Sequence, residues 1–239
     1  MWNNSFNIAI IEWLNQYSQF SPKFNQIIAY IESAYAFKGL AVMSMLWYLW
    51  FENPDLLSET KVIIVGAIIS CILALIVTSA INYIVPFQPT PIANEFVGFK
   101  IPSGVVIERS SNTGHGWINS FPSHHATMFY ALATGIFLAS RRLGCFAFIY
   151  VTFFIAFPRL YLGFHYPTDI LAGATVGILT ANLVNQRIFR KAYGKPFMTL
   201  MMKHPALSQT ALFIVTFEIA VLFYDAINFL RLLVKHLLK

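Results

Sequence analysis

The fold is decided by residues 121–173, which read FPSHHATMFYALATGIFLASRRLGCFAFIYVTFFIAFPRLYLGFHYPTDILAG. Two apolar runs begin in this stretch, Thr127 to Ser140 and Ile170 to Leu183, and each follows a short group of polar residues. Each run has the composition of a helix that enters hydrocarbon. The chain is therefore expected to place polar groups at the start of two membrane helices.

The beginnings of these two helices carry residues that helix N-termini prefer. Ser123 is a good N-cap, Pro167 suits a first helical turn, and Asp169 stands where an acid complements the helix dipole. If both N-termini face one spot, their N–H groups and positive dipole ends favour an anion, of which phosphate is the usual example. The pattern predicts a phosphate site, with Ser123 among its binding residues.

The polar side chains of the same stretch suit phosphoryl transfer. His165 and Asp169 are four residues apart, so on one helical turn the carboxylate can hold one ring nitrogen and free the other to attack. Arg159 offers a planar fork of donors for phosphate oxygens, and His125 can protonate a leaving oxygen. The alternative is a structural hydrogen-bond network, but ionisable groups at membrane depth are costly and usually functional.

Two short motifs also carry a resemblance to a known family. Residues 122–125, PSHH, resemble the second signature of the type 2 phosphatidic-acid phosphatase superfamily, Pro-Ser-x-His. Residues 159–169, RLYLGFHYPTD, resemble its third signature, Arg-x5-His-x3-Asp. The resemblance covers about residues 82–184. It implies a phosphohistidine on His165, the roles given above for the other residues, and no metal or other cofactor.

The chain departs from that family at the first signature, Lys-x6-Arg-Pro. Residues 81–91 keep the prolines but have Ile81 in place of the lysine and Gln88 in place of the arginine. Gln88 stays among the expected phosphate-binding residues, but two cations are missing. Lys100 and Arg109 are expected to compensate, at least one of them folding over the site; the alternative is that both are solvated.

Composition places the chain in a membrane. Of its 239 residues, 57% are hydrophobic and 11% charged, whereas about 25% are charged in soluble domains. The mean hydropathy is +0.63. The net charge of +6 comes from cations in short loops beside apolar runs, which suits membrane orientation better than nucleic-acid binding. Cys71 and Cys145 lie inside apolar runs, so they are expected to be packing residues.

The expected architecture is an all-α polytopic bundle of about six transmembrane helices, in a single domain over residues 1–239. The N-terminal segment, with Trp13 and Tyr17, suits an interfacial amphipathic helix or an ordinary cap packed on the bundle. Residues 186–204 are expected to be a basic connector. The expected spans are 34–51, 62–84, 124–140, 143–157, 170–185 and 206–230.

The longest polar stretch, Val85 to Ser120, leads directly into Ser123. Loops of this length within compact domains are usually functional or disordered. The stretch is interpreted as a flap over the site, with a solvated spacer as the alternative.

The cations predict how the bundle is oriented. When loops are numbered alternately, most cations fall on one face, which the positive-inside rule makes cytoplasmic. The motif loops then face the periplasm or the cell exterior, and a bacterial inner membrane is the expected location. The tail cations Arg231, Lys235 and Lys239 run against this assignment. The cations on the expected cytoplasmic face are Lys61, Arg141, Arg142, Arg187, Arg190, Lys191, Lys195 and Lys203.

The sequence as a whole predicts a metal-independent phosphatase that acts on a membrane lipid phosphate. Undecaprenyl diphosphate is the first choice, because the amino-acid sequences of the two motifs resemble those of bacterial polyprenyl-diphosphate phosphatases of the superfamily. A lipid phosphotransferase with the same residues is one alternative. A non-catalytic lipid-binding or transport protein is another, suggested by Glu218 and Asp225 in the last span. The expected partners are a lipid phosphate and the bilayer, and the oligomeric state stays open.

Overall fold

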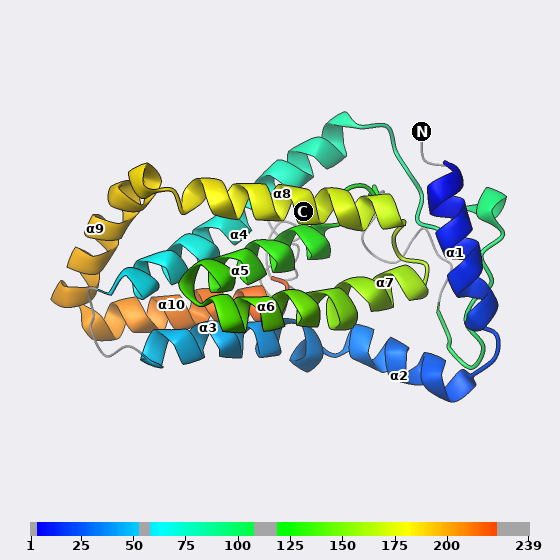
Figure 1. The fold of residues 1–239 in the computed structure, drawn as a ribbon, viewed down its shortest axis with the longest axis horizontal. Helices are drawn as coiled ribbons and strands as arrows, with labels where there is room; N and C mark the ends of the chain where they lie inside the picture. Colours follow the sequence, from blue (N-terminus) through cyan, green and yellow to red (C-terminus); the bar gives the residue numbers. More distant parts are fainter. Residues whose placement is uncertain (1–3, 53–57, 108–118, 224–239) are drawn as a thin grey trace, which may run out of the picture.

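The computed structural model describes residues 4–52, 58–107 and 119–223, and every regular element in that part of the chain is helical (Figure 1). The predicted all-α class is therefore confirmed. The elements in order are α1 (Ser5–Tyr17), α2 (Pro22–Ser33), the π-helix η1 (Ala36–Leu40), α3 (Ala41–Glu52), α4 (Glu59–Ile84), the 3-10 helix η2 (Glu95–Val97), α5 (His124–Ala139), α6 (Arg141–Tyr150), the π-helix η3 (Val151–Ala156), α7 (Phe157–Tyr161), α8 (Pro167–Val184), α9 (Arg187–Lys203) and α10 (Pro205–Ala220).

The helices α4, α5 and α8 form the centre of the bundle, and small residues allow them to approach closely. A Cβ atom at Gly177 of α8 would overlap the Thr127 carbonyl oxygen of α5, and one at Gly173 would lie 2.5 Å from the Ser123 carbonyl oxygen. Small residues at such contacts let helix backbones meet in a membrane. The close packing brings the N-terminal ends of α5 and α8, and hence both motifs, to one place.

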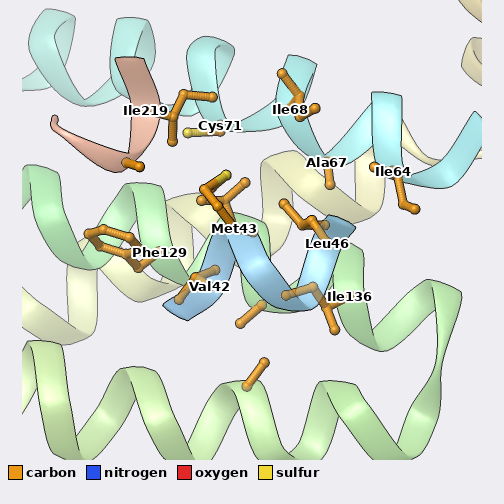
Figure 2. Packing of buried hydrophobic residues seen from close by; sticks show 14 of the residues in the cluster. Val42, Met43, Leu46, Ile64, Ala67, Ile68, Cys71, Phe129, Ile136 and Ile219 are labelled. Atoms are coloured by element: carbon orange, nitrogen blue, oxygen red, sulfur yellow. The ribbon is translucent and has the colours of Figure 1, made fainter. Parts of the chain in front are cut away.

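The apolar core is formed mainly by α3, α4, α5 and α10, with further residues from α6, η3 and α9, and Figure 2 shows part of it. Phe129, Leu46 and Ile136 are almost fully buried in it. Cys71 is also buried there, as expected of a packing residue, but Cys145 on α6 is exposed, so that half of the prediction was wrong. The core holds the three central helices in fixed positions and so fixes the motif ends as well.

Three helices in the described part of the chain are long and apolar enough to cross a membrane. They are Glu59–Ile84, Arg141–Tyr161 and Pro167–Val184. The expected span 143–157 was too short, because one continuous helix runs from Arg141 through η3 and α7 to Tyr161. Arg159 thus lies in the last turn of a helix rather than before one. The total of six spans stays a prediction.

Two helices were not predicted. The expected connector 186–204 contains α9, which continues through an internal Pro196 and buries Gly194, Met198 and Met201. The other is α2, which starts with a Ser21 N-cap and Pro22, a strong start signal. Both were missed because their apolar faces are narrow and are interrupted by polar residues.

The basic helix α9 lies at the end of the molecule opposite to α1 and α7 (Figure 1). It is fastened to the start of α4 by an ion pair of 2.6 Å between Arg190 Nη1 and Glu59 Oε1. The α6 residues Arg141 and Arg142 follow directly on the end of α5, so they also lie far from the α5 N-terminus. We call the end with α9 and the start of α6 the basic end, and the end with the N-termini of α5 and α8 the motif end. Their separation agrees with the alternate loop numbering that was used to predict the orientation.

The N-terminal helix α1 packs across the motif end of the bundle, against α7 and α8 (Figure 1). Its Asn7 is fully buried: the side chain donates to Thr168 Oγ1 at 2.8 Å and accepts from the Thr168 N–H at 3.2 Å. The opposite face exposes Phe6, Trp13 and Tyr17. The helix therefore packs on the bundle as a cap and also exposes aromatic side chains on its other face. It combines features of the two predictions, a packed cap and an interfacial amphipathic helix.

Candidate active site

The two helix starts meet as the sequence pattern predicted. Ser123 is the N-cap of α5, and its hydroxyl accepts from the Ala126 N–H at 3.4 Å. Asp169 closes the first turn of α8 by accepting from the Tyr166 N–H at 2.8 Å. The Ser123 N–H donates to the Asp169 carbonyl oxygen at 3.1 Å, so one hydrogen bond joins the two starts directly. The positive ends of two helix dipoles are thereby brought side by side.

His165 lies just before α8, not within it. The residue before a proline avoids helical backbone angles, and α8 starts only at Pro167 after an extended Tyr166. The expectation that His165 and Asp169 share a helical turn was therefore wrong, although the two side chains still meet. His165 Nδ1 lies 3.6 Å from Asp169 Oδ2.

The Ser120 carbonyl oxygen fixes the tautomer of His165. His165 Nδ1 lies 3.0 Å from this oxygen, which can only accept a hydrogen bond. We therefore assign the proton to Nδ1, which leaves the lone pair of Nε2 available for attack. The Ser120 hydroxyl also donates to Asp169 Oδ2 at 2.6 Å. Ser120 thus orients both members of the pair, a role that the sequence analysis missed because Ser120 stands outside both motifs.

Burial keeps His165 neutral near neutral pH. Its side chain is 10% exposed, and this desolvation lowers the pKa of His165 below its ordinary value. The nearby Asp169 carboxylate acts in the opposite direction but does not outweigh the burial. A neutral imidazole is the form that can act as a nucleophile.

His125 and His124 serve different neighbours at the start of α5. His124 Nε2 lies 3.3 Å from the Ser79 hydroxyl on α4. His125 interacts electrostatically with Arg159, Lys38 and His165. That His125 acts together with the third-motif residues stays a prediction.

Arg159 is half-buried near the same site. Its Nη1 donates to Glu32 Oε1 of α2 at 2.6 Å, and its guanidinium lies 5.7 Å from the Phe164 ring centroid. The buried Nε atom has no hydrogen-bond partner within residues 4–52, 58–107 and 119–223. One edge of the guanidinium is thus held by a carboxylate while Nε keeps donor capacity.

Gln88 is hydrogen-bonded to Ser120, the residue that contacts both His165 and Asp169. Its carbonyl oxygen accepts from the Ser120 N–H at 2.9 Å, and its own N–H donates to Asn119 Oδ1 at 3.1 Å. The residue is 1% exposed. Neither polar atom of its side-chain amide has a hydrogen-bond partner in the part of the chain that the structure describes. Buried amides are rarely left unpaired, so this one calls for an explanation.

The other expected phosphate-binding residues are less clearly placed. Lys100 is exposed, and its backbone is bonded to Asn15 of α1 at 2.9 Å and 2.6 Å. No hydrogen bond or ion pair from its side chain to the described motif residues is present. Arg109 lies outside the described residues. The described part of the long loop does cover the third motif, because the Ile92 N–H donates to the Gly163 carbonyl oxygen at 3.0 Å and Phe99 packs against Gly163.

The last span supplies one further acid. Glu218 Oε2 is buried and has no partner among the residues that the structure describes. Asp225 lies outside those residues. Within the same part of the chain, no group of three or more His, Cys, Asp or Glu side chains is arranged to hold a metal ion.

The comparisons with known proteins give the class of this all-helical chain: it is a phosphatase. Residues 94–193 match the family model of the PAP2 superfamily. The matched region contains both motifs and the helices α5 to α8, and it confirms the resemblance that the motifs predicted. No solved structure matches the chain.

Three curated relatives are similar to the chain. The bacitracin transport permease protein BcrC of Bacillus licheniformis is 25% identical over 185 residues, which cover 76% of this chain and 80% of the relative. The undecaprenyl-diphosphatase BcrC of Bacillus subtilis is 28% identical over 102 residues, covering 41% of this chain and 46% of the relative. YbjG of Escherichia coli is 36% identical over 83 residues, covering 33% and 41%.

Proposed function

We propose that this protein hydrolyses a phosphate monoester or diphosphate on a membrane lipid through a phosphohistidine intermediate on His165. The observation that carries the proposal is the hydrogen bond of 3.0 Å between His165 Nδ1 and the Ser120 carbonyl oxygen. It leaves Nε2 unprotonated, and Arg159 interacts electrostatically with His165. Such an arrangement suits attack on a phosphorus atom whose oxygens are held by positive groups.

The reaction would run in two displacements. His165 Nε2 forms a bond to the terminal phosphorus while the bond from that phosphorus to the leaving oxygen breaks, and His125 donates a proton to this oxygen. The leaving oxygen is the bridging oxygen of a diphosphate, which leaves the lipid monophosphate, or the lipid oxygen of a monoester. Asp169 and Ser120 hold the imidazole as it gains positive charge. His125 then takes a proton from water, which attacks the phosphohistidine and releases inorganic phosphate.

The phosphate oxygens would be bound by groups from both motifs and from the degenerate first signature. Arg159 offers its unpartnered Nε, and the N-terminal turn of α5, capped by Ser123, offers backbone N–H groups. The side-chain amide of Gln88 is a further, uncharged donor for the phosphate. Its buried N–H group has no partner among the described residues, and a bound phosphate oxygen would accept from it.

Lys100 and Arg109 belong to the loop whose described part lies over Gly163. We propose that at least one of them closes over the phosphate when the substrate binds. Each is neutralised separately to glutamine, and phosphate release is measured. We expect at least one variant to lose about tenfold or more in turnover, as expected for loss of a group that stabilises transition-state charge. If neither does, these two residues are solvated.

Undecaprenyl diphosphate is the proposed substrate, with the reaction on the periplasmic or external side of a bacterial inner membrane. The name of one relative, an undecaprenyl-diphosphatase, supports this choice. The motif end also lies opposite to the basic helix α9 (Figure 1).

The test is inorganic phosphate release by purified protein over a panel of lipid phosphates, with the His165→Asn variant as the blank. The panel includes undecaprenyl diphosphate, phosphatidic acid and phosphatidylglycerol phosphate. We expect release that requires His165 and that is fastest with the diphosphate. Labelled phosphate that appears only in a second lipid or sugar would identify a transferase, and no turnover of any substrate would overturn the proposal.

A further inference from the structure

Three charged side chains form a buried cluster next to the motif residues. Glu32 comes from α2, Lys38 from η1 and Arg159 from α7. Glu32 Oε1 lies 2.6 Å from Arg159 Nη1 and 3.6 Å from Lys38 Nζ. The three side chains are 16%, 6% and 15% exposed, so the cluster is largely removed from water.

The cluster borders the reacting groups. Lys38 interacts electrostatically with Arg159 and with His125, which is the proposed general acid. Arg159 interacts electrostatically with His165. Lys38 is therefore in electrostatic reach of the site, although it stands far from both motifs in the sequence.

The charges of the cluster do not cancel. Two cations share one carboxylate, so the trio carries one excess positive charge in a place with little water. Buried charges are costly unless they are paired. The unpartnered Nε of Arg159, within the described residues, also points to a missing acceptor. Both observations indicate that the cluster is built to take up an anion.

The family signature that usually supplies cations is degenerate in this chain. Ile81 and Gln88 carry no charge, and the Gln88 backbone is hydrogen-bonded to Ser120. A diphosphate brings more negative charge than Arg159 alone can balance. A cation from another element is therefore needed at the site.

We propose that Lys38 is a phosphate-binding residue, and that it supplies from the N-terminal segment a cation that residues 81 and 88 do not provide. Glu32 is a positioning residue that holds Lys38 and Arg159 at a common place. The fitting ligand is the phosphate or diphosphate group of a lipid. This inference rests on the proposed phosphatase function, because it assigns a residue to the same site.

The experiment compares Lys38 with a matched lysine at the opposite end of the bundle. Lys61 is equally buried, at 4% exposed against 5%, and each lysine lies 5.5 Å from an aromatic ring centroid. Lys38→Gln, Lys38→Arg and Lys61→Gln are purified in detergent, and their thermal unfolding is measured. Lys38→Met is the second neutral variant should Lys38→Gln not fold.

Two quantities are measured for each folded variant: kcat/KM with a lipid diphosphate, and the inhibition constant of inorganic pyrophosphate. For the neutral Lys38 variant we expect kcat/KM to fall by about 30-fold or more and pyrophosphate inhibition to weaken by about tenfold, as for loss of a charge-assisted contact. Lys38→Arg should keep most of both, and Lys61→Gln should resemble the unmodified protein. If Lys38 had only a structural role, pyrophosphate would inhibit the neutral Lys38 variants as strongly as it inhibits Lys38→Arg and Lys61→Gln.

The two proposals fail in different ways. If the unmodified protein releases no phosphate from any substrate, the proposed function is wrong. If it is active and the neutral Lys38 variants match Lys61→Gln in both quantities, only the role of Lys38 is wrong. The Glu32→Gln variant should lower kcat/KM while pyrophosphate inhibition persists, because it releases both cations without removing either.

Discussion

At the scale of single residues, the site depends on how one imidazole is held. The Ser120 carbonyl oxygen and the Asp169 carboxylate both face His165 Nδ1, at 3.0 Å and 3.6 Å. The carbonyl is the closer of the two and can only accept, so it sets the tautomer. Asp169 adds charge stabilisation and also accepts from the Ser120 hydroxyl and the Tyr166 N–H.

Replacing the two members of the pair should have different consequences. We expect His165→Asn to be inactive, because the nucleophile is lost. Asp169→Asn should keep measurable activity, with a rate of phosphate release lower by about 10²- to 10³-fold. Some activity remains because the Ser120 carbonyl oxygen still holds His165 in the tautomer that Asp169 helps to maintain. Initial rates of phosphate release check both. More than about a hundredth of normal turnover in His165→Asn would contradict covalent catalysis.

The pH dependence of kcat/KM should report on His165. Its pKa is lowered by burial, so the nucleophile stays neutral, and the enzyme active, from neutral pH to below about 6.5. Activity should fall only at lower pH, where the imidazole takes up a proton. The negative charge of Asp169 raises this pKa, so Asp169→Asn should move the acid limb of the profile to still lower pH. A shift to higher pH would contradict the assigned contact.

At the scale of elements, α1 is fastened to the start of α8 beside Asp169. Asn7 is fully buried and makes two hydrogen bonds to Thr168, of which one satisfies a backbone N–H in the first turn of α8. Free N–H groups at a helix start need such partners when they are removed from water. The N-terminal helix therefore stabilises the start of the helix that carries Asp169.

We expect Asn7→Ala to lower the free energy of unfolding by about 1–3 kcal/mol, because it leaves the Thr168 N–H without this partner. Thermal unfolding in detergent measures the change. The exposed Gln16→Ala on the same helix is the control, and it should stay within about 0.5 kcal/mol of the unmodified protein. Equal stability of the two variants would show that the Asn7 contact contributes little.

At the scale of the whole molecule, the bundle has a basic end formed by α9 and the start of α6 and a motif end covered by α1 and the long loop (Figure 1). Only one of these ends can face the cytoplasm if the helices cross the membrane. Positive charge in short loops favours the cytoplasmic side for α9. In the proposed orientation, the motif end faces away from the cytoplasm.

Cysteine labelling in cells would test this orientation. Lys191→Cys and Lys100→Cys are each made in a Cys145→Ser background, because Cys145 is exposed and Cys71 is buried. We expect a membrane-impermeant thiol reagent to label position 100 in intact spheroplasts and position 191 only after lysis. The reverse result would place the motif end in the cytoplasm.

Activity of the whole enzyme should also survive metal removal. The proposed mechanism uses Arg159, Lys38 and helix N-termini where other phosphatases use metal ions. We expect phosphate release to persist in EDTA after dialysis. Loss of activity that one added divalent ion restores would contradict the metal-independent mechanism, whereas mild stimulation by Mg²⁺ through the substrate diphosphate would not.

The sequence by itself determined the helical class, both helix starts and the motif residues Arg159, His165 and Asp169, because composition, caps and spacing are local properties of the chain. The prediction that His165 and Asp169 share a helical turn was wrong, because α8 starts only at Pro167. Only the tertiary structure decided that the Ser120 carbonyl holds His165 and that Glu32 joins Lys38 to Arg159. Glu32 and Arg159 are 127 positions apart, and such contacts depend on how whole helices pack, which no local pattern records.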